Sequence, residues 1–203
     1  MSAARHPRRA IVVALAGAVL LLSACSTQQA GSAATMGETR ITETELNNEV
    51  QQVLEAQGLP LDTADAAVTS TTLGRMIVIY LVDIVAAREG VAVTQGRIDE
   101  SLAAYVAEAG DQAAMEASFA QQGVAPSQIQ DFVELNIQAQ DIGIALAPNG
   151  SAEEQGAAVF DAVSALSVEM DVTTSPRFGT WDPLTLQVGP VADDLSMLPA
   201  PAQ

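Results

Sequence analysis

The sequence predicts a mainly α (α+β) domain with a small antiparallel sheet formed by its two ends, and three observations lead to this fold class. Of the 203 residues, 49% are hydrophobic but only 3% are aromatic, a composition that favours packed helices. Apolar residues recur at helical spacing in six stretches, each of which begins with capping residues or a proline. Near the C-terminus the apolar period shortens to two, as in a strand.

Two long helices are predicted in the first half of the chain. Thr42 and Glu45 have the spacing of a capping box, and apolar residues follow at helical spacing until Gly58-Leu59-Pro60. A Thr/Ser cluster at residues 69–72 begins the second helix, which is almost continuously apolar up to Gly90. Because this helix is apolar on nearly all sides, we expect it to be the central and most buried one.

Four further helices are predicted from the same signals, a capping residue or proline at the start and a glycine or Pro-Asn-Gly turn at the end. They begin at Thr94, Asp111, Pro126 and Ser151. Ser151 and Glu154 repeat the capping-box spacing, and the last helix is expected to end near Leu166.

The predicted sheet is assembled from both ends of the domain. Apolar residues alternate over residues 168–172, which predicts a strand, and Pro176 restricts the next residues to an edge or turn. Residues 34–36 and 39–41 flank Gly37-Glu38, and a glycine in first position suits a type II′ hairpin turn. Because an isolated hairpin is only marginally stable, we expect it to pair with the C-terminal strand.

The N-terminal segment has the pattern of a secretory signal peptide. Three arginines precede a fifteen-residue apolar stretch at residues 10–24, which is shorter than the about 20 residues of a membrane-spanning helix. Leu22-Ser23-Ala24-Cys25 resembles the lipobox of bacterial lipoproteins. We therefore expect cleavage between Ala24 and Cys25 and a diacylglyceryl group on Cys25, the only cysteine. An ordinary secretory signal followed by a coincidental cysteine is the alternative.

Four segments are expected on this basis. They are a lipoprotein signal peptide at residues 1–24, a lipidated tether at 25–35, a helical domain at 36–182 and a Pro-rich tail at 183–203. Two acyl chains on Cys25 give stable membrane anchoring, which a single chain does not. The expected location is the outer face of the cytoplasmic membrane.

The composition of the mature chain excludes several function classes. Residues 25–203 hold five arginines, no lysine and no histidine against 25 acidic residues, a formal charge of −20. Such a surface repels phosphate backbones, so no nucleic-acid partner is expected. Without histidine or lysine there is no Ser–His or Cys–His nucleophile pair, imidazole metal site or lysine Schiff base. We therefore expect no enzyme, no metal and no cofactor besides the lipid, although paired carboxylates remain arithmetically possible.

Three segments resemble the SurA-type N-terminal chaperone domain family. MGETRITETEL at residues 36–46 is similar to the family's V-N-G-x-x-I-T motif, and LVDIVAAREGVAVT at 81–94 is similar to its junction between two helices. SPRFGTWD at 175–182 resembles the N-P-R-Y-G-x-W-D motif of actinobacterial lipoproteins of this family. The positions that fall on the family motifs are Gly37, Ile41, Thr42, Pro176, Arg177, Phe178, Gly179, Trp181 and Asp182. The chain departs from the motifs at Gly37-Glu38, where Asn-Gly is usual, and at Ser175 and Phe178, where Asn and Tyr are usual.

The resemblance implies a peptide-binding helical module that binds unfolded or exported polypeptides. In foldases such as SurA and PrsA a parvulin prolyl-isomerase domain precedes the C-terminal motif, whereas only Pro148-Asn149-Gly150 separates the last two predicted helices here. The implied function is an accessory chaperone or holdase without isomerase activity. Two alternatives remain open, a non-catalytic scaffold or adaptor of a cell-envelope complex and a lipoprotein that binds a small ligand in an apolar cavity.

Several motif residues also have a purely structural interpretation. Trp181 and Phe178 are expected to anchor the C-terminal segment by packing, and Arg177 to form an ion pair with one of the many carboxylates. Three methionines could line an adaptable groove for client chains, but their helical spacing favours core packing. They are Met76, Met115 and Met170.

Overall fold

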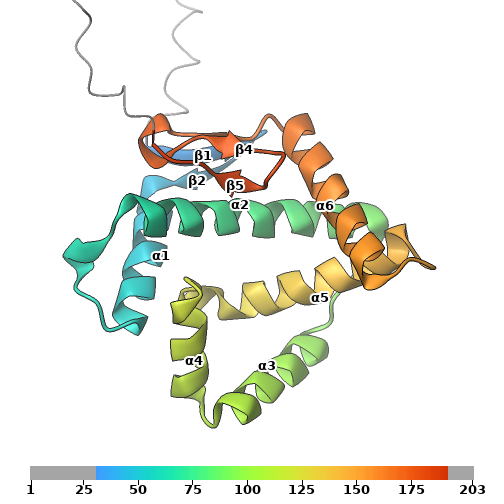
Figure 1. The fold of residues 1–203 in the computed structure, drawn as a ribbon, viewed down its shortest axis with the longest axis horizontal. Helices are drawn as coiled ribbons and strands as arrows, with labels where there is room; N and C mark the ends of the chain where they lie inside the picture. The colour runs from blue at the N-terminus through green and yellow to red at the C-terminus, as the bar shows by residue number, and fades with distance from the viewer. Residues whose placement is uncertain (1–30, 192–203) are drawn as a thin grey trace, which may run out of the picture. The chain divides into compact units, whose positions relative to one another are not determined.

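The computed structural model describes residues 31–191 of the chain (Figure 1). The predicted signal peptide, the cleavage site, Cys25 and the end of the predicted tail lie outside the described residues. Within them the fold is mainly helical with a small antiparallel sheet, which confirms the predicted fold class at that level. The helices are α1 (Glu43–Ala56), α2 (Ala66–Glu89), α3 (Gln95–Ala109), α4 (Gln112–Gln121), α5 (Ile129–Leu146) and α6 (Ala152–Glu169).

Both predicted capping boxes are present and begin their helices as expected. At the start of α1, Glu45 N donates to Thr42 Oγ1 at 3.1 Å and Thr42 N donates to Glu45 Oε2 at 2.7 Å. At α6, Glu154 N donates to Ser151 Oγ at 3.3 Å and Ser151 N donates to Glu154 Oε2 at 2.7 Å. These reciprocal bonds satisfy amide groups that have no partner inside a helix.

Helix α2 begins earlier than predicted but occupies the predicted place. Asp65 Oδ1 accepts a hydrogen bond from Val68 N at 2.8 Å, so the helix starts before the Thr/Ser cluster at residues 69–72. The helix lies beneath the strands and contacts α1, α5 and α6 (Figure 1). Helix α2 is long and apolar enough to cross a membrane, but the core helix of a soluble protein can have the same length and composition. Eight of its 24 residues are buried here, as expected for the central helix.

A three-stranded antiparallel sheet joins the two ends of the domain in the order β2-β1-β3. Its strands are β1 (Ser32–Met36), β2 (Thr39–Thr42) and β3 (Thr173–Thr174). The predicted hairpin is confirmed, and its turn has Gly37 at φ +60°. The next residue, Glu38, does not have a positive φ. A positive φ at the first central residue alone is what the predicted type II′ turn requires.

The prediction of a strand at residues 168–172 is wrong. Helix α6 continues to Glu169, Val168 is 64% exposed, and the strand that pairs with β1 is Thr173–Thr174. The local helical hydrogen bonds, continued by Met170 N donating to Leu166 O at 2.9 Å, override a short alternating pattern. The pairing of a C-terminal strand with the N-terminal hairpin is nevertheless confirmed.

Two predicted segment boundaries also need correction. Strand β1 begins at Ser32, so residues 32–35 belong to the sheet and not to the tether; Ala33 and Ala34 are buried there. Strand β5 (Gln187–Val188) pairs with β4 (Trp181–Asp182), so the folded part extends into the segment predicted as a tail.

The buried residues form two clusters. The sheet-side core joins the three-stranded sheet, α1, α2 and α6 with the segment around Trp181. The smaller cluster, here called the α3–α4 lobe, joins α3, α4 and the start of α5 and lies away from the sheet (Figure 1). Its buried members are Ile98, Met115, Phe119, Val124, Ile129 and Val133. Helix α5 takes part in both clusters, because Ile142 near its end belongs to the sheet-side core.

Candidate functional site

The residues of the two terminal motifs come together, and they stabilise the fold. Arg177 Nη1 lies 3.0 Å from the Glu43 carboxylate, which confirms the expected ion pair and joins the two motifs. Phe178 and Trp181 are 9% and 7% exposed, and Trp181 Nε1 donates to Ser167 Oγ at 2.6 Å. The packing interpretation of both aromatic residues is therefore confirmed.

The remaining motif positions also shape the backbone. Ile41 is buried in the sheet-side core, Pro176 begins a short 3-10 turn, and Asp182 Oδ1 accepts from Leu184 N at 2.9 Å. Gly179 has φ +110°, and a Cβ there would overlap the Gly189 carbonyl oxygen. Only glycine fits this position.

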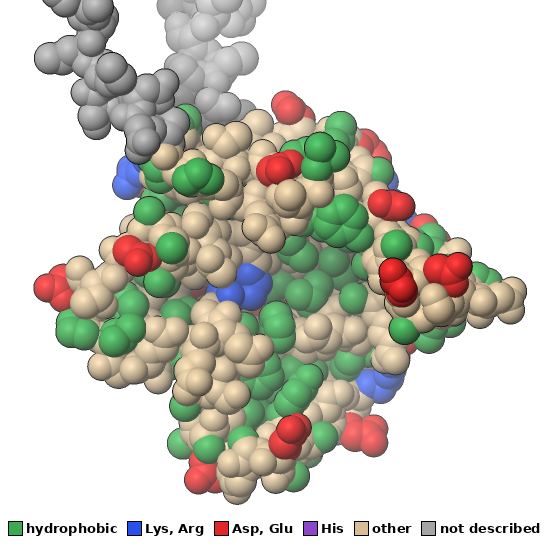
Figure 2. All heavy atoms as spheres, in the orientation of Figure 1, with side chains coloured by type: hydrophobic (Ala, Val, Ile, Leu, Met, Phe, Trp, Pro, Cys, Tyr) green, Lys and Arg blue, Asp and Glu red, His purple; other side chains and the backbone are tan. Residues whose placement is uncertain are grey.

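A different part of the surface, between α2, α5 and the α3–α4 lobe, is hollowed. The upper hollow, about 450 Å³, lies between α2, α5 and β5, and the lower hollow, about 410 Å³, lies between α3, α4 and the start of α5. Phe132 lines both, so the two hollows adjoin at this ring. Figure 2 shows hydrophobic side chains gathered on this face beside a basic side chain near its centre.

Three aromatic side chains, Tyr105, Phe119 and Phe132, form part of the wall of the lower hollow. The Phe119 ring lies edge-on to Tyr105, at 5.3 Å between centroids, and to Phe132, at 5.9 Å. Such T-shaped pairs add specific attraction to the burial of their surfaces. Tyr105 is 37% exposed, and Met115 completes the apolar wall, so part of this surface is open to a partner.

The expected core packing of the methionines is confirmed, and one of them also lines the lower hollow. Met115 is 6% exposed and belongs to the α3–α4 lobe. Met76 and Met170 pack against the sheet-side core, where Met170 lies under the Gly37 turn.

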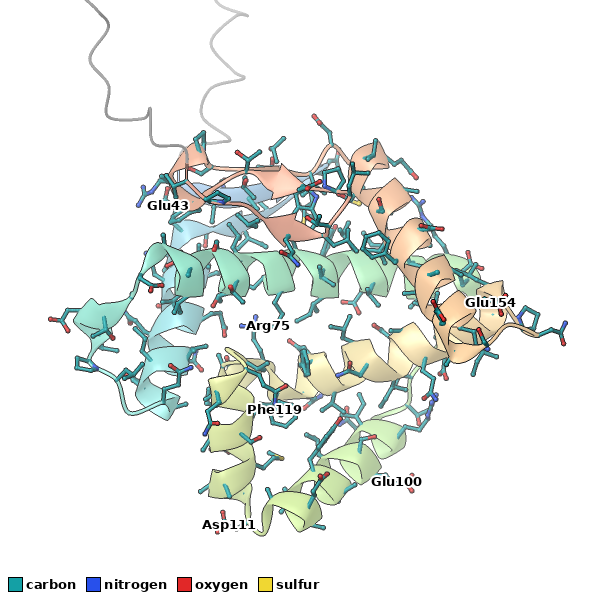
Figure 3. The ribbon with its side chains drawn as sticks, in the orientation of Figure 1. Glu43, Arg75, Glu100, Asp111, Phe119 and Glu154 are labelled. Atoms are coloured by element: carbon teal, nitrogen blue, oxygen red, sulfur yellow. The ribbon has the colours of Figure 1, made fainter. Side chains whose placement is uncertain are left out.

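The basic side chain at the centre of this face is Arg75 on α2 (Figure 3). Its Nε donates to Gln128 Oε1 at 3.3 Å, while its Nη2 is buried without a hydrogen-bond partner. Burial lowers the pKa of Arg75 to about 10, and the nearby Glu49 carboxylate partly opposes this shift. The guanidinium therefore remains protonated at neutral pH.

Sequence reasoning missed Arg75 and Phe132. A signal for Arg75 was present, because it is the one charged residue in the first seventeen of the almost continuously apolar helix α2. Phe132 had no such signal, since its position on an apolar helical face is equally typical of core packing.

Comparisons with known proteins do not assign this chain to a family. No protein family, curated protein or solved structure was found that matches this chain. Within residues 31–191 no group of three or more His, Cys, Asp or Glu side chains is placed to hold a metal ion.

Proposed function

We propose that this chain is an accessory chaperone, a holdase that binds unfolded exported polypeptides and has no catalytic activity. The observation that carries the proposal is the pair of hollows that adjoin at Phe132, the upper one mainly apolar and the lower one lined by both aromatic and polar side chains. Each has a volume within the range of ligand-binding clefts, roughly 300–1,000 Å³. Together they offer neighbouring places for apolar side chains of one extended segment.

The chemistry of the lining supports binding without catalysis. Among the residues that line the two hollows, the ionisable side chains are Arg75, Tyr105 and Glu108. Tyr105 and Glu108 line the lower hollow and Arg75 the upper one, and none of them is hydrogen-bonded to a nucleophile. Aromatic rings and a methionine adapt to varied apolar partners, which suits a protein with many clients.

The proposed location, the outer face of the cytoplasmic membrane, follows from the lipobox-like segment at Leu22–Cys25. With a mature charge of −20, the protein body is repelled by anionic head groups, so only the lipid holds it at the membrane. In a detergent phase-separation experiment, Cys25→Ala should move the protein from the detergent phase to the aqueous phase. Retention of the variant in the detergent phase would contradict the lipoprotein proposal.

The chaperone proposal is tested by the suppression of aggregation. Residues 26–203 at a few-fold molar excess should reduce the light scattering of several chemically denatured proteins on dilution. Moderate salt should change this little, because apolar contacts dominate the binding. Phe132→Gln should weaken the suppression, whereas Phe160→Gln, on an exposed apolar ring of α6 (39% exposed), should not.

The same experiment separates the holdase from a scaffold or adaptor. An adaptor binds one cognate protein at fixed stoichiometry and leaves the aggregation of unrelated proteins unchanged. If suppression is absent for all the denatured proteins while a single envelope protein co-purifies stoichiometrically, the holdase proposal is wrong and the adaptor takes its place.

A further inference from the structure

Arg75 differs from the other arginines in the described part of the chain. Arg88, Arg97 and Arg177 are exposed and each forms an ion pair with a carboxylate. Arg40 is exposed on the hairpin. Arg75 alone among these five is largely buried, and within residues 31–191 it forms no ion pair, although the chain holds 25 acidic residues.

The neighbours of Arg75 leave part of its hydrogen-bonding capacity unused. A guanidinium carries five N–H donors. Nε is used by Gln128, and Nη2 has no acceptor but is closed off from solvent, so a ligand would have to meet the guanidinium at Nη1. The nearest acidic influence is Glu49, whose carboxylate accepts from Ser127 Oγ at 2.9 Å and lies beyond ion-pair distance. Glu49 compensates the charge of this buried cation only in part, and an anion that fits beside the guanidinium would stabilise it further.

The hollow that Arg75 lines offers an anion one cationic partner, and the rest of its wall is largely apolar. No acidic side chain lines it, and its apolar walls come from α2, α5 and the segment around β5. These walls are Val78, Phe132, Leu135, Leu186 and Val188. A ligand must therefore combine one negative group with apolar substituents, and a carboxylate matches the planar fork of a guanidinium.

We propose that the upper hollow binds the C-terminal carboxylate of an apolar polypeptide, with Arg75 as its counter-ion and the last side chain against the apolar wall. The inference rests on the proposed function, because it names which part of a client is held there. A polypeptide is favoured over a small acid because the hollow adjoins the lower hollow at Phe132. The residues before the carboxylate can thus continue along the same face towards Phe119 (Figure 3).

The test compares two fluorescent peptides of one apolar sequence, about eight residues long, one with a free C-terminal carboxylate and one with an amide. On the unaltered protein the carboxylate peptide should bind about tenfold or more tightly, the ratio that one charge-assisted hydrogen bond supports. Arg75→Gln should remove this difference and leave the affinity for the amide peptide unchanged. Arg40→Gln makes the same change in net charge at an exposed site and should preserve the difference.

Each other outcome overturns the inference in a distinguishable way. Equal binding of the two peptides, with aggregation still suppressed, would contradict the terminal-carboxylate site and leave the holdase proposal standing. Failure of both peptides and of the denatured proteins would contradict both proposals. If N-acetyl-leucine binds in an Arg75-dependent manner while neither peptide does, the hollow is a small-acid site. The comparison on the unaltered protein remains decisive if Arg75→Gln fails to fold.

Discussion

The sheet-side core and the α3–α4 lobe are built from the same kinds of side chain but are held together differently. The sheet-side core joins Ala33 and Ala34 near one end of the described chain to Trp181 near the other, so it is closed by contacts between distant segments. The lobe uses one nearly continuous stretch, from Ile98 to Val133. Helix α2 buries eight of its 24 residues, whereas α3 buries one of fifteen, Ile98.

The difference separates a scaffold from a binding surface. A core closed by distant segments holds α2, which carries Arg75, and the later part of α5 in fixed positions. The lobe keeps apolar and aromatic surface partly open around the lower hollow, and it has few buried contacts of its own. Regions with few buried apolar contacts open more readily, and binding surfaces are drawn from them.

The largest expected contrast concerns two glycines with similar positive φ angles. Gly179 (φ +110°) supports the sheet-side core, and Gly110 (φ +99°) joins α3 to α4. A Cβ at Gly179 would overlap the Gly189 carbonyl oxygen, whereas a Cβ at Gly110 meets nothing within 4 Å. Gly179→Ala should therefore lower the free energy of unfolding by about 4 kcal/mol or more, and Gly110→Ala by about 1–3 kcal/mol from backbone strain alone.

Urea unfolding followed by circular dichroism measures both losses. Equal destabilisation by the two substitutions would show that the segment around Gly179 is not closed as tightly as the geometry requires. A loss at Gly110 that exceeds the loss at Gly179 would reverse the roles assigned to the two regions.

The second expected contrast is in local stability. Amide groups in α3 and α4 should exchange with solvent through openings that cost roughly 2 kcal/mol less than those that expose α2 and α6. Besides its own cluster, the lobe is held by single polar contacts, such as the hydrogen bond from Gln57 Nε2 of α1 to Ala120 O and the ion pair of Arg97 with Asp141. Hydrogen exchange read by mass spectrometry or NMR gives the comparison. Uniform protection across all six helices would contradict a separate, more readily opened lobe.

The smallest expected effect is a difference in sign between two aspartates of α5. Burial, and then repulsion from Asp83, raises the pKa of Asp131, so its ionised form destabilises the fold at neutral pH. A hydrogen bond from Arg97 lowers the pKa of Asp141, so its ionised form stabilises the fold above the carboxyl's usual pKa near 3.8. Asp131→Asn should therefore raise the melting temperature at pH 7, and Asp141→Asn should lower it.

Both effects should be under about 1 kcal/mol, because the two carboxylates keep contact with solvent. The effect at Asp131 should be lost once the pH falls below the carboxyl's usual pKa near 3.8, and the effect at Asp141 should fade below that value as the pH falls through its lowered pKa. Thermal unfolding at pH 7 and pH 3 checks the two signs. If both substitutions changed the melting temperature at pH 7 in the same direction, the opposite electrostatic roles given to Asp131 and Asp141 would be wrong.

Features encoded by residues close together in the chain could be predicted from the sequence. The capping boxes at Thr42 and Ser151 and the turn at Gly37 each depend on neighbours within a few residues. The burial of α2 followed from its composition. These signals determine helix starts and turns because the residues that interact are only a few positions apart in the chain.

Features that depend on distant segments could not be predicted. The alternation over residues 168–172 favoured a strand, but the actual strand is set by the register of Thr173 and Thr174 against β1, about 140 residues away. The hollows form only when α2, α5 and β5 meet, so no local pattern marks Phe132 as their shared wall. Arg75 was visible as a charge in an apolar helix, but its missing counter-ion is a property of the packed structure.

Site-specific photo-crosslinking tests the central claim, that client chains bind at the adjoining hollows, most directly. The photoreactive residue benzoylphenylalanine replaces Phe132 in one variant and Phe160, an exposed ring outside both hollows, in another. With a denatured client present, illumination should yield crosslinked client at position 132 and little at position 160. Equal crosslinking at both positions, or crosslinking at 160 alone, would contradict the assignment of the hollows as the client-binding surface.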